Sequence, residues 1–421
     1  MAAPSDHHTA RADEQAPSNC RFSVAEAEMW QVDEMTWTGA AEHADLYTSA
    51  VSLIQTLRGI GSQLERGAVH YEPHHDMADR CRSLSLYLAS AVADAERDAY
   101  APAFGSLRSA LEHVLIDKLI SQGTQCVRIL EGVEEQIWQQ WDRDRKAGQG
   151  WADVLSWNWR NGVVRAKMTG PYVRGEDGTT QPIGFLYFLL DEYSPYLGLP
   201  DEQVHFDDGL TDVAERVTAA KHHRTLHATY LRWKSITESL VENQLADSQS
   251  VRMINVHNRF LSAFVHPNTN AIRQLYGKNR RTWPTYDHYS SELVLLYVNV
   301  LAAEELKSFH AMTQRPPTIG ISGWADVFGQ CAQAWTVSSH LWFPGQAPHE
   351  FDRFQEANRR VFRGQKSGEH PLVRPDALSD ADIGYYANPL DRLIEMHSSR
   401  RELMSGLVYR SPWHRGDAQF R

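Results

Sequence analysis

An arginine and a histidine seven residues apart, Arg259 and His266, are the residues of this sequence best suited to chemistry on a phosphate group. Positions seven apart return to nearly the same face of an α-helix, so both side chains would project from one side. A guanidinium group matches phosphate oxygens, and an imidazole transfers protons near neutral pH. The small residues Ser262 and Ala263 leave a shallow gap between them. The pair therefore favours one of two interpretations: a phosphate or RNA site, or a solvated polar helix face whose end is held by His266.

The helix that carries this pair has one polar and one apolar side. The polar positions are Arg252, Asn255, Arg259, Ser262 and His266. The opposite positions, which we expect to pack inward, are Met253, Val256, Phe260 and Phe264. Pro267 cannot continue a helix, so we expect His266 to lie beside the loop that follows. We call these polar positions the polar stripe, and it predicts Asn255 and Ser262 as supporting neighbours of Arg259 and His266.

The surroundings of this helix are basic although the chain as a whole is acidic. The formal net charge is −11, so any nucleic-acid binding must come from a local patch. Residues 248–286 contain no carboxylate, and the loop after Pro267 mixes cations with aromatic residues. Such mixtures neutralise phosphates and stack unpaired bases. We therefore predict an RNA-binding set made of Arg252, Arg273, Lys278, Arg280, Arg281 and Trp283.

A second charged pair lies upstream. Arg108 and Glu112 are four residues apart beside a leucine stripe, so they can pair on one helix face. One interpretation is an ion pair that fixes the register of the helix. The other is that Glu112 orients His266 from a neighbouring helix, as carboxylates do for catalytic imidazoles.

The segment from Asn258 to His266 resembles the Arg-x4-6-His motif of the HEPN superfamily, helical proteins that include many ribonucleases. The string Leu261-Ser262, followed by Val265-His266-Pro267-Asn268, is similar to bacterial helical proteins grouped with HEPN. Their upstream helix often carries an Arg and a Glu, as Arg108 and Glu112 stand here. The resemblance covers residues 77–312 without the insertion described below.

This resemblance implies metal-independent RNA cleavage at a dimer interface, in a toxin or defence setting. Arg259 would hold the phosphate and His266 would handle the proton of the 2′-hydroxyl. The superfamily often has a polar residue directly after the Arg, whereas this chain has Phe260. The alternative is therefore a non-catalytic helical binding or scaffold protein, which the same fold would serve.

The sequence predicts neither a cofactor nor a metal site. His223 and His227 share a helix face and could chelate zinc, but no acidic residue beside them completes a site. A metalloenzyme that uses these two histidines is the third hypothesis. The four cysteines lie far apart and form no CxxC pair, which argues against a zinc ribbon or a redox motif.

Hydrophobic periodicity predicts a mainly α fold, a helical bundle with a small β-containing insertion. The expected helices cover residues 41–59, 77–99, 101–121, 124–146, 211–246, 250–265, 287–312, 324–341, 349–362 and 389–403. Asp177-Gly178 is a strong turn signal and predicts a β-hairpin in the insertion.

These elements divide the chain into five parts. We expect a flexible segment 1–40, a helical half 41–147, a Trp- and Gly-rich insertion 148–205, a second helical half 206–313 and a helical extension 314–421. The tryptophans near the insertion favour an oligomer contact, and a homodimer is expected. No apolar run is long enough for a membrane span and no secretory signal is visible, so a cytoplasmic protein without membrane contact is expected.

Overall fold

The computed structural model describes residues 34–67, 72–130, 228–265, 289–314, 320–368 and 373–404, four strands between residues 152 and 182, and a few single positions. The described residues are mainly helical, as predicted. His266 and the loop that follows it lie outside the described residues, except for single positions at 269 and 275.

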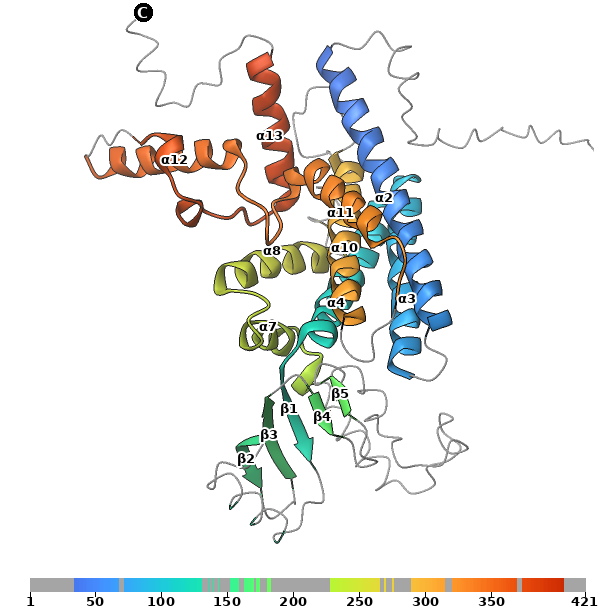
Figure 1. Ribbon diagram of the computed structural model, residues 1–421. Coiled ribbons are helices and arrows are strands. Elements are labelled where there is room, and N and C mark those ends of the chain that lie inside the picture. Colours follow the sequence, from blue (N-terminus) through green and yellow to red (C-terminus); the bar gives the residue numbers. More distant parts are fainter. Residues whose placement is uncertain are drawn as a thin grey trace, which may run out of the picture.

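Four long helices form the centre of the molecule (Figure 1). They are α2 (Glu34–Gly67), α3 (Glu72–Ala95), α4 (Tyr100–Gln122) and α10 (Tyr289–Thr313). Helix α10 packs against the other three. An unbroken run of its residues, 290–303, is buried, which is the pattern of a helix enclosed on all sides. No helix in the described ranges is both long and apolar enough to cross a membrane.

Helices α7 (Trp233–Glu242) and α8 (Ser248–Val265) lie against α4. The contact between α4 and α8 is aromatic: the ring centroid of Phe104 lies 5.3 Å from that of Phe260 and 4.9 Å from that of Phe264. Of the positions predicted to face inward, Met253, Phe260 and Phe264 are buried, and Val256 is half-buried. Their burial turns the opposite, polar side of α8 outward along the edge of α4.

The C-terminal part consists of α11 (Trp324–Val337), α12 (Glu350–Lys366), α13 (Pro389–Met404) and the short 3-10 helices η4 (Ser339–Leu341), η5 (Pro375–Ala377) and η6 (Asp380–Asp382). Helix α11 packs on α10 and α2, and α13 packs on α10, α8 and η4. Buried residues from Leu46 on α2 to Met396 on α13 form one continuous hydrophobic cluster. Residues of both predicted helical halves and of the extension therefore contribute to this cluster, and a smaller second cluster includes Met253, Trp342 and Ala357.

The strands form two small antiparallel sheets at one end of the molecule (Figure 1). β1 (Gln125–Leu130), β3 (Val163–Thr169) and β2 (Ala152–Asn158) pair in that spatial order. β4 (Tyr172–Arg174) pairs with β5 (Thr180–Pro182) on either side of the predicted hairpin turn, which itself lies outside the described residues. A separate insertion domain stays a prediction.

The helix predicted from residue 124 is wrong over its first turns, because β1 occupies residues 125–130. The backbone N–H groups of Thr124 and Gln125 both donate to the side-chain oxygen of Asn243, each at 2.7 Å. Asn243 thus takes up the donors that a starting helix would leave unpaired. The chain then continues as an extended strand that pairs with β3. Contacts with distant parts of the chain override the local helical pattern here.

Candidate functional site

Arg108 on α4 is the centre of a polar group that joins α4 to α8. We call Arg108, Glu112, Asn258 and Ser262 the α4/α8 polar centre. Arg108 Nη2 donates to Glu112 Oε1 at 2.7 Å, and Nε donates to Ser262 Oγ at 2.9 Å. Ser262 Oγ donates in turn to Asn258 Oδ1 at 3.3 Å. The predicted pairing of Arg108 with Glu112 is confirmed, and Arg108 also binds the polar stripe of α8.

The third nitrogen of this guanidinium group, Nη1, is buried and has no hydrogen-bond partner in the described part of the chain. The group packs over the ring of Trp233, 5.0 Å from the centroid, and Trp233 Nε1 donates to Asn255 Oδ1 at 2.6 Å. A buried charged donor without an acceptor is energetically costly. Nη1 is therefore suited to an anionic oxygen supplied by a ligand.

The structure places the other predicted site residues in three ways. Arg252 and Arg259 are exposed on α8. Asn255 and Ser262 are half-buried and hydrogen-bonded, as described above. The remaining residues lie outside the described part of the chain: His266, Arg273, Lys278, Arg280, Arg281 and Trp283. The pairing of Arg259 with His266 and the basic loop thus stay predictions, as does zinc chelation by the undescribed residues His223 and His227.

A different histidine of α8, His257, faces the core. Its Nδ1 lies 2.8 Å from the hydroxyl of Tyr297, and its Nε2 lies 2.7 Å from the hydroxyl of Tyr385. Burial lowers the pKa of His257 to about 3, so the imidazole is neutral at physiological pH. His257 therefore ties α8 to α10 and to the segment before α13, and it cannot serve as a solvent-facing base.

A buried ionic group joins α3, α4 and α10. Asp117 on α4 forms an ion pair with Arg80, and His113 Nδ1 lies 3.2 Å from Asp117 Oδ2. Burial raises the pKa of Asp117, but the charge of Arg80 and hydrogen bonds from His113 and Glu305 together outweigh burial and hold that pKa below its ordinary value. Burial and the charge of Asp117 raise the pKa of the neighbouring Glu305. The pKa values of the two carboxyl groups are therefore shifted in opposite directions, and Asp117 is the one whose charged form the fold favours.

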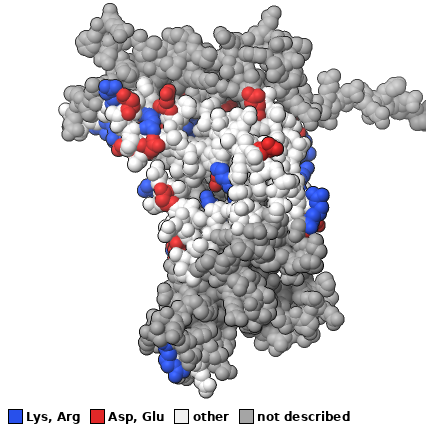
Figure 2. All heavy atoms as spheres, in the orientation of Figure 1, with Lys and Arg blue, Asp and Glu red and all other residues white. Residues whose placement is uncertain are grey.

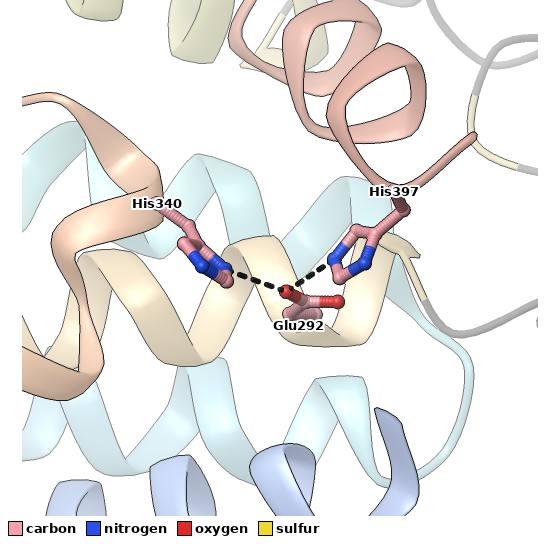
Figure 3. A group of neighbouring side chains, drawn as sticks. All are labelled: Glu292, His340 and His397. Carbon is pink, nitrogen blue, oxygen red and sulfur yellow. Dashed lines mark hydrogen bonds and ion pairs between the residues drawn. The ribbon is translucent and has the colours of Figure 1, made fainter. Parts of the chain in front are cut away.

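A second polar group was not predicted from the sequence. We call it the Glu292 cluster, and it consists of Glu292, His340 and His397 (Figure 3). Glu292 is in the first turn of α10, His340 in η4 and His397 in α13. Glu292 Oε1 accepts a hydrogen bond from His397 Nε2 at 2.9 Å and lies 3.8 Å from His340 Nδ1. These residues are too far apart in the chain to form a spacing motif. The available signal was a carboxylate directly before the apolar run Leu293–Val298.

Burial by itself raises the pKa of Glu292. The charge of His397 and hydrogen bonds from both imidazoles outweigh burial and hold the pKa below its ordinary value. Glu292 is therefore a buried carboxylate that stays ionised. Comparisons of this chain with protein-family models, curated proteins and solved structures find no match.

Proposed function

We propose that the α4/α8 polar centre binds a phosphate group of RNA and that Arg259 and His266 complete a metal-independent ribonuclease site around it. The observation that carries the proposal is the Nη1 atom of Arg108, a buried cationic donor without a partner in the described ranges. The other donors of that guanidinium group are held by Glu112 and Ser262, which fixes its orientation. A fixed guanidinium group with one open donor suits a phosphate oxygen.

Access and charge agree with this role. The side chain of Arg108 is 16% exposed and that of Glu112 is 35% exposed, so the centre reaches the surface. Arg259 is exposed one turn from Ser262, and α8 contributes no carboxylate. Figure 2 shows acidic and basic residues interspersed over the described surface of one face, without a broad basic area. RNA binding would therefore be local and strongly salt-dependent.

The resemblance to HEPN proteins supplies the chemistry of the proposal. His266 removes the proton of a 2′-hydroxyl, and the 2′-oxygen attacks the adjacent phosphorus. The bond from phosphorus to the 5′-oxygen breaks, and that oxygen takes a proton from water. The products are a 2′,3′-cyclic phosphate and a 5′-hydroxyl. Arg108 and Arg259 neutralise the charge that develops on the phosphate oxygens.

The test compares wild type with His266→Ala and Arg259→Ala on mixed single-stranded RNA in EDTA. We expect wild type to cleave the RNA, and His266→Ala to lose at least about 100-fold in rate while still binding it. Arg259→Ala should weaken binding. Arg374→Ala is the matched control, because Arg374 is also exposed but lies beside η5 and pairs only with Asp376 among the described residues.

Two results would separate the alternatives. If wild type leaves the RNA intact but binds it more tightly than Arg259→Ala does, the protein is a non-catalytic RNA-binding protein. RNA that neither binds nor is cleaved would overturn the proposal and favour a scaffold protein. The dimer that the resemblance implies can be measured in the same preparations by sedimentation.

A further inference from the structure

The Glu292 cluster brings together three groups that each bind metal ions in proteins. One donor atom from each of Glu292, His340 and His397 lies within 4.8 Å of the others. Figure 3 shows the carboxylate between the two imidazoles, which approach it from opposite sides. Three separate elements, α10, η4 and α13, supply these groups. The fold thus assembles a constellation that no local sequence pattern encodes.

One oxygen of the carboxylate is left over. Glu292 Oε1 faces both imidazoles, but Oε2 is buried and has no hydrogen-bond partner in the described residues. The side chain of Glu292 is only 4% exposed. Buried carboxylates normally have both oxygens satisfied, because an unpaired charged oxygen is costly to bury. An ion at this point would supply the missing partner.

We propose that Glu292, His340 and His397 bind a divalent transition-metal ion of the zinc type. Two imidazoles with one carboxylate form a donor set that suits Zn²⁺, whereas Mg²⁺ and Ca²⁺ prefer oxygen donors alone. Ligands of a tetrahedral zinc ion are about 3.4 Å apart, given bonds of about 2.0–2.1 Å. The separations from Glu292 Oε1, 2.9 Å to His397 Nε2 and 3.8 Å to His340 Nδ1, lie on either side of that value.

The residues around the cluster hold the two histidines in place. Arg392 on α13 donates to the backbone oxygen of His340 and forms a bidentate ion pair with Asp352 at 2.7 and 2.6 Å. Both members of that pair are buried, so η4, α12 and α13 are fixed relative to one another. The ring of His349 lies 5.8 Å from that of His340. Support of this kind orients metal ligands before the ion arrives.

Solvent reaches the cluster through its histidines. The side chains of His340 and His397 are 20% and 11% exposed. His349, the neighbour of His340, lines an open groove of about 1180 Å³ together with Lys118, Glu304 and Lys307. Three protein ligands leave at least one coordination position for water or a small anion. The site lies between α10, η4 and α13, and it does not depend on the RNA site proposed between α4 and α8.

The test uses the full chain freed of metal with a chelator and titrated with Zn²⁺ in a calorimeter. We expect wild type to bind one equivalent of Zn²⁺ that His340→Ala and His397→Ala either do not bind or bind at least about tenfold more weakly. Zinc should also raise the melting temperature of wild type more than that of the variants. His310→Ala is the control, since His310 is a half-buried histidine of α10 that packs on Trp324 and Phe328.

Other histidines of the chain can bind zinc, so the difference between variants decides the outcome. Equal stoichiometry and affinity in wild type and both histidine variants would overturn the proposal, as would equally tight binding of Mg²⁺. If circular dichroism shows that the alanine variants do not fold, Glu292→Gln replaces them, because it keeps the size of the side chain and removes the charge. Co²⁺ in place of Zn²⁺ gives a visible absorption band from histidine-coordinated metal, which should disappear in Glu292→Gln and persist in His310→Ala.

Discussion

The α4/α8 polar centre and the Glu292 cluster are each organised by one charged side chain, but with opposite charge and burial. Arg108 is a cation near the surface, held by Glu112 and Ser262 with one donor left open. Glu292 is an anion in the interior, placed between two imidazoles with one acceptor left open. The first arrangement suits a large anionic ligand that docks from outside. The second suits a small cation that enters and is enclosed.

The largest expected difference between the two centres is in stability. Removing one partner of a buried charged group costs about 3–5 kcal/mol, so Glu292→Ala should lose that much in unfolding free energy. Glu112→Ala should lose less, about 1 kcal/mol, because Glu112 is about one-third exposed, solvent partly screens its pair with Arg108, and Arg108 keeps its hydrogen bond to Ser262. Urea unfolding in EDTA measures both values. Equal losses would show that the two centres do not differ in burial as described.

The second largest difference should be in how stability depends on pH. The pKa of Glu292 is lowered from its ordinary 4.5, so its stabilising contribution is present above pH 4.5 and is lost as the pH falls through the lowered value. Glu292→Gln has no charge to titrate. We therefore expect the stability difference between wild type and Glu292→Gln to shrink as the pH falls below about 4.5, in unfolding experiments with EDTA. A difference that stays constant on acidification would contradict the assignment of Glu292 as an ionised carboxylate.

The smallest effect should be at the surface of α8. Arg259→Ala should change the unfolding free energy by less than about 0.5 kcal/mol, because the side chain is exposed. If Arg259 contacts one phosphate of single-stranded RNA, its removal should reduce the slope of log affinity against log salt by about 0.7. Fluorescence anisotropy over a salt series measures this slope. An unchanged slope, or the same reduction in Arg374→Ala, would show that Arg259 does not contact the RNA.

Where the sequence predicted an element well, the determining residues are close together in the chain. The helix expected over 101–121 is observed as Tyr100–Gln122, and the helix expected over 250–265 is Ser248–Val265. A leucine stripe with Gly123 after it fixes the first, and a polar and an apolar side fix the second. The pairing of Arg108 with Glu112 is equally local.

The features that were not predicted depend on residues that are far apart in the chain. Strand β1 depends on Asn243, which is 119 residues from Thr124, and His397 is 105 residues from Glu292. Hydrophobic periodicity and motif spacing depend only on residues within a few helical turns of one another. Neither of these long-range contacts can therefore be predicted from them. The carboxylate directly before the apolar run Leu293–Val298 of α10 was the available clue to the Glu292 cluster.

The enclosed position of α10 also bears on how the chain acquires its structure. Asn299 of α10 donates to the backbone of Leu46, 253 residues earlier, while α13 covers another part of the same helix from later in the chain. Contacts of such long sequence separation form slowly. Until they form, α10 exposes an apolar surface on all sides, and newly made chains at high concentration should associate through it. Slow dilution, or a chaperone that shields this helix, should therefore raise the yield of refolded protein.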